Sequence, residues 1–177
     1  MPTSLKDAYL YCPRCGELFA ERSDSLSTCS ECGLHLYHSP KPCVGIILVG
    51  DDGKLLMVRR GRDPHIGTWD VPGGFCEINE TVIEAAIREA EEELHVKIEV
   101  DTVLDSLPEK YPYNNIEHSI LSAFVIARIV SGQPTPDDDI DDMKYFTAEE
   151  ALGLPFGFPS LKKGIQMYID ERKKDTP

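Results

Sequence analysis

The chain has 177 residues, of which 41% are hydrophobic and 28% are charged, proportions that exclude a disordered or collagen-like chain. The formal net charge of −13 argues against a nucleic-acid-binding surface, which needs clustered Lys and Arg to displace counterions from phosphates. No run approaches the roughly 18 apolar residues of a membrane span, and the N-terminus lacks the apolar core of a signal peptide. We therefore expect a cytoplasmic protein that binds neither nucleic acid nor membrane.

The first part of the chain carries two Cys-x-x-Cys pairs, formed by Cys12, Cys15, Cys29 and Cys32. Two such turns are typical of a tetrahedral Zn²⁺ site, and the glycine after each pair suits a positive φ. The alternative is two disulfides, which a reducing cytoplasm disfavours. We predict a structural zinc ribbon over residues 1–38 and, because it contains two prolines, a linker over residues 39–42.

A β-hairpin is predicted next. Residues 44–49 and 55–58 are apolar runs of strand length, separated by an Asp-Asp-Gly-Lys turn. Three arginines follow at positions 59, 60 and 62 of this otherwise acidic chain. Guanidinium groups pair well with phosphate oxygens, so Arg59 and Arg60 are candidate substrate-binding residues; the alternative is solubilising charge at a strand end.

A glycine loop and then an amphipathic helix come after the hairpin. Thr81 and Glu84 match the S/T-x-x-E capping box, so we expect the helix to begin at Thr81. At about 100° per residue, an apolar stripe should face the core, formed by Ile83, Ala86, Ile87, Ala90 and Leu94. The opposite side carries Arg88, Glu89, Glu92 and Glu93. By itself such a side is usually only a solvated acidic surface.

The spacing of the whole segment gives these charges a second interpretation. From Gly74 through Glu80, Arg88-Glu89 and Glu92-Glu93 to Val96, the chain resembles the Nudix box, G-x5-E-x7-R-E-U-x-E-E-x-G-U, where U is aliphatic. His95 stands where the family has glycine. That glycine ends the helix as a left-handed cap, a conformation that histidine enters more readily than most residues. We expect a modest cost in stability and no loss of catalysis.

The resemblance implies a fold and a set of roles. Residues 39–177 would form an α/β fold, a Nudix α/β/α sandwich with a mixed sheet, preceded by the small zinc-ribbon module. Mg²⁺ or Mn²⁺ would be coordinated by Glu89, Glu92, Glu93 and the Gly73 carbonyl. Arg88 and Glu80 would orient the glutamates. Asp139 stands at a further acidic position of the family, just before a segment ending in Tyr145-Phe146; the alternative is a solvated acidic loop over residues 137–142.

A zinc ribbon followed by a Nudix domain resembles the NADH pyrophosphatase branch of the family. That branch has an S-Q-P-W-P-F-P-like signature after the box, whereas this chain has the segment 109–114, EKYPYN. The resemblance implies hydrolysis of a nucleoside diphosphate linked to another group, with ADP-ribose or a dinucleotide such as NADH as substrate. The alternative is a non-catalytic module that senses a nucleotide, and a homodimer is left open.

Three further predictions concern the remainder of the chain. Tyr111 and Tyr113, in an expected loop, are candidates for stacking on the substrate base; the alternative is that they cover a sheet edge. A buried strand is predicted over residues 119–127, and helices over residues 147–152 and 160–173. The last helix should bury Leu161, Ile165, Tyr168 and Ile169.

Overall fold

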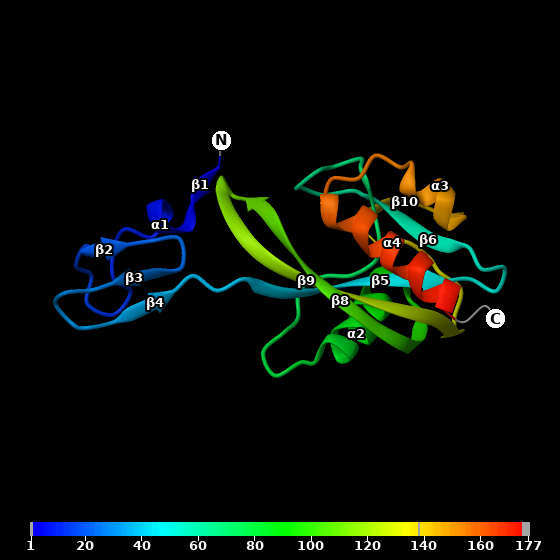
Figure 1. Cartoon of the computed structure of the whole chain (residues 1–177), viewed down its shortest axis with the longest axis horizontal. Coiled ribbons are helices and arrows are strands. Elements are labelled where there is room, and N and C mark those ends of the chain that lie inside the picture. Colours follow the sequence, from blue (N-terminus) through cyan, green and yellow to red (C-terminus); the bar gives the residue numbers. More distant parts are fainter. Residues whose placement is uncertain (1, 138, 175–177) are drawn as a thin grey trace. The chain divides into compact units, whose positions relative to one another are not determined.

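The computed structural model describes residues 2–137 and 139–174 (Figure 1). The chain divides into two compact units, one of residues 1–41 and 110–120, the other of residues 42–109 and 121–177. The sequence predicts a domain boundary at residue 38, and this boundary stays a prediction. Nothing in the sequence indicates that residues 110–120 belong with the first unit. None of the described helices is long and apolar enough to cross a bilayer.

The first unit is built from short elements around the cysteines. Its elements are β1 (Thr3–Ser4), α1 (Leu5–Ala8), β2 (Glu21–Arg22), β3 (Leu26–Thr28) and β4 (His35–Tyr37). Strands β2, β3 and β4 form an antiparallel sheet, and β1 pairs in parallel with residues 116–117. Gly16 and Gly33 have φ values of 81° and 70°, which confirms the positive φ expected after each cysteine pair.

The second unit is built on a larger sheet. Its strands are β5 (Lys41–Val49), β6 (Leu55–Arg60), β7 (Trp69–Asp70), β8 (Lys97–Tyr113), β9 (Ile116–Ser131) and β10 (Ile140–Phe146), of which β5, β8 and β9 extend into the first unit. The order is β9-β5-β6-β10, with β8 paired to β9 and β7 paired to β6. Val49 lies opposite Leu55 in the antiparallel β5–β6 pair, so the predicted hairpin is confirmed.

Two predicted loops are strands in the structure. Lys41 and Pro42, expected in a linker, begin β5, and the Pro42 carbonyl accepts a hydrogen bond from the Cys76 amide. The segment 111–113, expected in a loop, is the end of β8. In both places proline suggested an interruption. Proline is tolerated near the start of a strand and on a strand such as β8 that pairs on one side, because no ladder donor is lost.

Helices cover both faces of the sheet, which confirms the α/β/α sandwich. They are α2 (Val82–Leu94), α3 (Ala148–Leu152) and α4 (Pro159–Lys174) (Figure 1). Successive residues of a strand face opposite sides, and neighbours on β9 show which helix covers each side. Val125 belongs to the core cluster that contains the buried side of α2. Phe124 packs against Gly164 of α4, where a β-carbon would clash with its ring.

The ends of α2 agree with the sequence analysis. The Thr81 hydroxyl accepts from the Glu84 amide at 3.2 Å, and the Glu84 carboxylate accepts from the Thr81 amide at 2.8 Å, so the predicted capping box is present. His95 caps the other end in the left-handed region, with φ 56° and ψ 34°. The helix therefore takes the left-handed cap even though no glycine occupies that position.

The buried side of α2 differs from the predicted stripe. Ala86, Ala90 and Leu94 are buried as expected, but Ile83 and Ile87 keep 44% and 39% of their surface exposed. The helix is turned so that the sides of Glu89 and Glu93 face inward and are partly buried. The buried side of the helix is Ala85, Ala86, Ala90 and Leu94, so the stripe of apolar residues does not predict which side packs on the sheet.

Candidate active site and zinc centre

The four cysteines of the first unit lie in one cluster. Their sulfur atoms are all within 4.8 Å of one another, with 3.6 Å between Cys12 and Cys32 and 3.5 Å between Cys15 and Cys29. Four sulfurs bound to one Zn²⁺ at about 2.3 Å are about 3.8 Å apart, so this spacing fits tetrahedral zinc. The short contacts join a cysteine of one pair to a cysteine of the other, the arrangement of a ribbon held by a single ion.

In the second unit, Arg88 connects the glutamates of the Nudix box. Its Nε and Nη2 donate to both carboxylate oxygens of Glu80, at 2.8 and 2.9 Å. Its Nη1 donates to Glu89 and to Glu92, both at 2.9 Å, and Nη2 also donates to the Phe75 carbonyl. These contacts hold the pKa of Glu80 below its usual value, mainly through the Arg88 hydrogen bonds. One guanidinium therefore fixes the side chains of three glutamates.

Glu93 is held separately, by the glycine loop. Its Oε2 accepts a 2.9 Å hydrogen bond from the Gly73 amide. Gly73 has φ 141°, and a β-carbon there would clash with the Val44 carbonyl, so the loop requires glycine. Burial raises the pKa of Glu93 to about 8, and the nearby charges of Glu89, Asp70 and Asp139 add to the shift. Glu93 therefore feels the charges of three further carboxylates, a local excess of negative charge. Among the described residues only the four cysteines bring three or more such ligand atoms within 4.8 Å of one another, so these carboxylates are near one another without forming a closed ligand set.

This excess of negative charge suits a hard divalent cation. Carboxylate oxygens are the ligands that Mg²⁺ and Mn²⁺ prefer, and such an ion would relieve the repulsion around Glu93. The predicted metal ligands have different partners in the structure. The carboxylates of Glu89 and Glu92 accept from Arg88, whereas that of Glu93 accepts from the Gly73 amide. Gly73 contacts Glu93 through its amide, whereas the sequence analysis assigned its carbonyl as a metal ligand.

The segment before β10 is tied to the end of α2. The Thr135 amide donates to the Leu94 carbonyl, and the Asp137 amide donates to the Glu93 carbonyl, both at 3.1 Å. This capping loop, residues 133–137, satisfies helix carbonyls that would otherwise lack partners. It also brings Asp139 to the side of Glu93, where its charge is felt. Asp138, part of the predicted acidic segment, lies outside the described residues.

The three arginines after the hairpin are all paired with carboxylates. Arg59 Nη2 lies 2.7 Å from Asp141, Arg60 Nη1 lies 2.9 Å from Asp70, and Arg62 Nε lies 2.5 Å from Asp139. Arg60 additionally donates to the Pro64 carbonyl at 2.7 Å and lies over the Phe158 ring. Arg60 Nε and Nη1 therefore already have protein partners, which the prediction of a phosphate contact did not anticipate.

Asp70 is a charged residue whose carboxylate acts on Glu93 and which the sequence analysis did not identify. Its carboxylate is buried, accepts from Arg60 and from the Val71 amide, and lies directly before the glycine loop. Burial raises its pKa against the opposing effect of Arg60. In the sequence, the signal for it is a charged residue between Trp69 and the apolar Val71-Pro72 pair.

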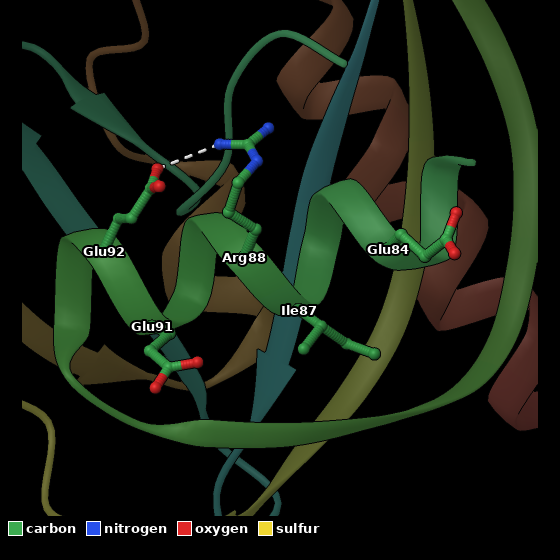
Figure 2. Close-up of a pocket in the computed structure, with 5 residues that line it drawn as sticks. All are labelled: Glu84, Ile87, Arg88, Glu91 and Glu92. Atoms are coloured by element: carbon green, nitrogen blue, oxygen red, sulfur yellow. Dashed lines mark hydrogen bonds and ion pairs between the residues drawn. The ribbon is translucent and has the colours of Figure 1, made fainter. Parts of the chain in front are cut away.

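The outer face of α2 carries a shallow pocket of about 360 Å³. It is lined by Glu84, Ile87, Arg88, Glu91 and Glu92. Figure 2 shows Arg88 and Glu92 reaching toward each other on one side of the helix, while Ile87 and Glu91 point to the other side. The pocket therefore borders the glutamate network.

Tyr111 and Tyr113 lie together on β8 in the first unit, with ring centroids 6.4 Å apart, and their contact with a substrate stays a prediction.

Comparison with known proteins identifies the family. The NUDIX domain matches residues 39–166, and the chain belongs to this family. It is 29% identical over 164 residues to the NAD-capped RNA hydrolase NudC of Pseudomonas aeruginosa, covering 92% of this chain but 56% of that protein. It is 30% identical to the ADP-ribose pyrophosphatase of Methanocaldococcus jannaschii, covering 75% of this chain and 77% of the relative. A NUDIX hydrolase from Nitrosomonas europaea has the same fold, with TM-score 0.72, 23% identity and 94% of both chains covered.

The names of these relatives affect one expectation. NudC is named for an RNA substrate, which conflicts with the expectation that no nucleic acid is bound. That expectation used the net charge of the whole chain, and a net charge says nothing about recognition of the end of a nucleic acid by a small site. The net charge therefore gives no ground for excluding a nucleic acid as a ligand.

Proposed function

We propose that the chain hydrolyses the pyrophosphate bond of a nucleoside diphosphate linked to another group, and that ADP-ribose is its preferred substrate. Water adds to one phosphorus, the P–O–P bond breaks, and two phosphate monoesters leave. The observation that carries the proposal is the pairing of one guanidinium with Glu80, Glu89 and Glu92, next to Glu93 held by the glycine loop. A non-catalytic nucleotide sensor has no need for so many ordered carboxylates.

The residues of the site would have distinct roles, either holding metal or positioning the residues that do. Glu89, Glu92 and Glu93 would hold Mg²⁺ or Mn²⁺, which when bound supplies a Lewis acid for the phosphates and an activated water. Arg88, itself held by Glu80, fixes the orientation of the Glu89 and Glu92 carboxylates through hydrogen bonds. The glycine loop fixes the position of the Glu93 carboxylate through the Gly73 amide. In the first unit, Zn²⁺ on the four cysteines would be structural.

Two facts favour ADP-ribose over a dinucleotide. The archaeal ADP-ribose pyrophosphatase is covered over 77% of its length, whereas the chain spans only 56% of NudC. The segment 109–114 also lacks the signature that the NADH pyrophosphatase branch carries after the box. NADH and RNA with a 5′ NAD cap are therefore the comparison substrates.

The test is a substrate panel. Purified protein is incubated with ADP-ribose, NADH and NAD-capped RNA in Mg²⁺ or Mn²⁺, and products are identified by mass spectrometry. We expect AMP and ribose 5-phosphate from ADP-ribose, with a higher kcat/KM than for the other two, and no products after chelation with EDTA. Binding of ADP-ribose without any product would instead support the nucleotide-sensing alternative.

A further inference from the structure

We propose that Arg62 is a phosphate-binding residue for the substrate, and that it exchanges the Asp139 carboxylate for a substrate phosphate on binding. The proposal rests on the proposed function, because it concerns the same site. It assigns different roles to three neighbouring arginines that the sequence alone does not distinguish.

Arg60 is excluded from this role by its environment. Its side chain and that of Asp70 are only 21% and 13% exposed, and its guanidinium also contacts Pro64 and Phe158. Moving Arg60 to a ligand would leave the buried Asp70 carboxylate without its cation, which is costly in a low-dielectric environment. Arg60 is therefore a structural residue that supports the strand before the glycine loop.

The Arg62–Asp139 pair is of the opposite kind. The two side chains are 61% and 52% exposed, and the recorded contact uses Arg62 Nε with a single carboxylate oxygen. Exposed pairs of this kind contribute little to stability, so little is lost when one breaks. A phosphate can engage the guanidinium through two parallel hydrogen bonds, which is the stronger arrangement. The exchange is therefore favourable for Arg62.

Backbone contacts keep both partners at the site while the side chains exchange. The Gly61 amide donates to the Asp139 carbonyl at 2.8 Å, and a β-carbon on Gly61 would press against the same carbonyl at 3.1 Å. On the other side, the Asp137 amide is bonded to the Glu93 carbonyl, and the Ile140 amide to the Asp137 carbonyl. Asp139 therefore stays beside Glu93 when Arg62 leaves it.

The exchange has a consequence for the acidic site. While Arg62 is paired with Asp139, it neutralises a carboxylate whose charge acts on Glu93. When Arg62 moves to a phosphate, the Asp139 charge is released toward Glu93. Arg59 is a less suitable candidate, because it lies on β6 opposite β10 and has two carboxylates in reach, Asp141 at 2.7 Å and Asp142 at 4.0 Å.

The experiment measures binding without turnover, in the full chain. The ligands are Mn²⁺ alone, and an ADP-ribose analogue with a methylene bridge between its phosphorus atoms, titrated at saturating Mn²⁺ by calorimetry. Arg62→Met should weaken analogue binding about ten- to a hundredfold, as expected for a lost charge-assisted contact, and tighten Mn²⁺ binding severalfold. Asp139→Asn should do the reverse for Mn²⁺, weakening it, and should leave analogue binding unchanged or tighter. Arg62→Lys should lie between Arg62→Met and the parent.

The matched control is Arg128→Met, which removes an exposed arginine paired with Glu99 and Asp101 elsewhere on the sheet. It should change neither affinity. The proposal is overturned if Arg62→Met binds the analogue like the parent, or if Asp139→Asn weakens the analogue as much as Arg62→Met does, since a purely structural pair gives equal losses. A chain that binds the analogue through Arg62 but hydrolyses nothing contradicts the proposed function alone.

Discussion

The Gly73 amide donates a hydrogen bond of 2.9 Å to Oε2 of Glu93, although 20 residues separate them in the chain. Through this bond the glycine loop and α2 set each other's position. It also means that Glu93, which is partly buried, is oriented by backbone and not by Arg88. Removing its charge should therefore leave the rest of the network in place.

Glu93→Gln should lower kcat by at least about a hundredfold, because a ligand for the charge-stabilising ion is lost. The amide is nearly isosteric and keeps an oxygen for the Gly73 amide, so Tm should change little. Steady-state rates on ADP-ribose in Mg²⁺ measure the effect. Glu92→Gln should behave in the same way, and Glu91→Gln, on an exposed position of the same helix, is the control. Full activity in the Glu93 variant would refute the metal-site assignment.

The purified protein should contain one zinc ion per chain, measured by elemental analysis. Because a small metal module folds only with its ion, strong chelation should unfold the first unit while most of the far-UV helix signal, from α2 and α4, persists. Cys29→Ser should reproduce this loss without a chelator. Zinc-free protein with a Cys12–Cys15 disulfide would contradict the prediction.

His95→Gly should raise Tm by a few degrees and leave kcat nearly unchanged. The backbone of His95 is left-handed, with φ 56°, a conformation that costs a residue with a β-carbon about 1 kcal/mol. The variant loses the exposed 3.8 Å contact with Asp137, which is a weak interaction. His95→Ala is the informative comparison, because it loses the same contact and keeps the strain. A glycine variant less stable than the alanine variant would contradict this account.

The capping box predicts a pH dependence of stability. Hydrogen bonds from Thr81 hold the folded pKa of Glu84 below its ordinary value of 4.5. The ionised form is therefore preferred in the folded state, so its contribution is complete above the unfolded pKa and is lost as pH falls through the folded pKa. The Tm difference between the parent and Glu84→Gln should be largest near pH 7 and should shrink below about pH 4. A difference that is constant with pH would show that the carboxylate charge has no role there.

The sequence predicted what local chemistry controls. The cap at Thr81 and the left-handed His95 depend on residues a few positions apart, and both are confirmed. The cysteine cluster is also confirmed, although it joins pairs 14 to 20 residues apart, because the repeated Cys-x-x-Cys spacing is itself a signal. The sequence did not predict features that depend on contacts between segments far apart in the chain. The exposure of Ile83 and Ile87 follows from packing against the sheet, and the partners of Arg60 and Arg62 follow from the pairing of β6 with β7 and β10. None of these contacts leaves a periodic signal in the chain.

The capping loop, residues 133–137, sets a limit on how this protein can vary in length. Its amides at Thr135 and Asp137 are fixed to consecutive carbonyls of the helix end, and Asp139 follows two residues later. An inserted or deleted residue there would move Asp139 away from Glu93 or uncap α2. The turn between β5 and β6, whose Asp51 and Asp52 are exposed, has no such anchor to the site. Domain insertions and affinity tags therefore belong in that turn, and the eight-residue connection from β9 to β10, residues 132–139, should be kept at its present length.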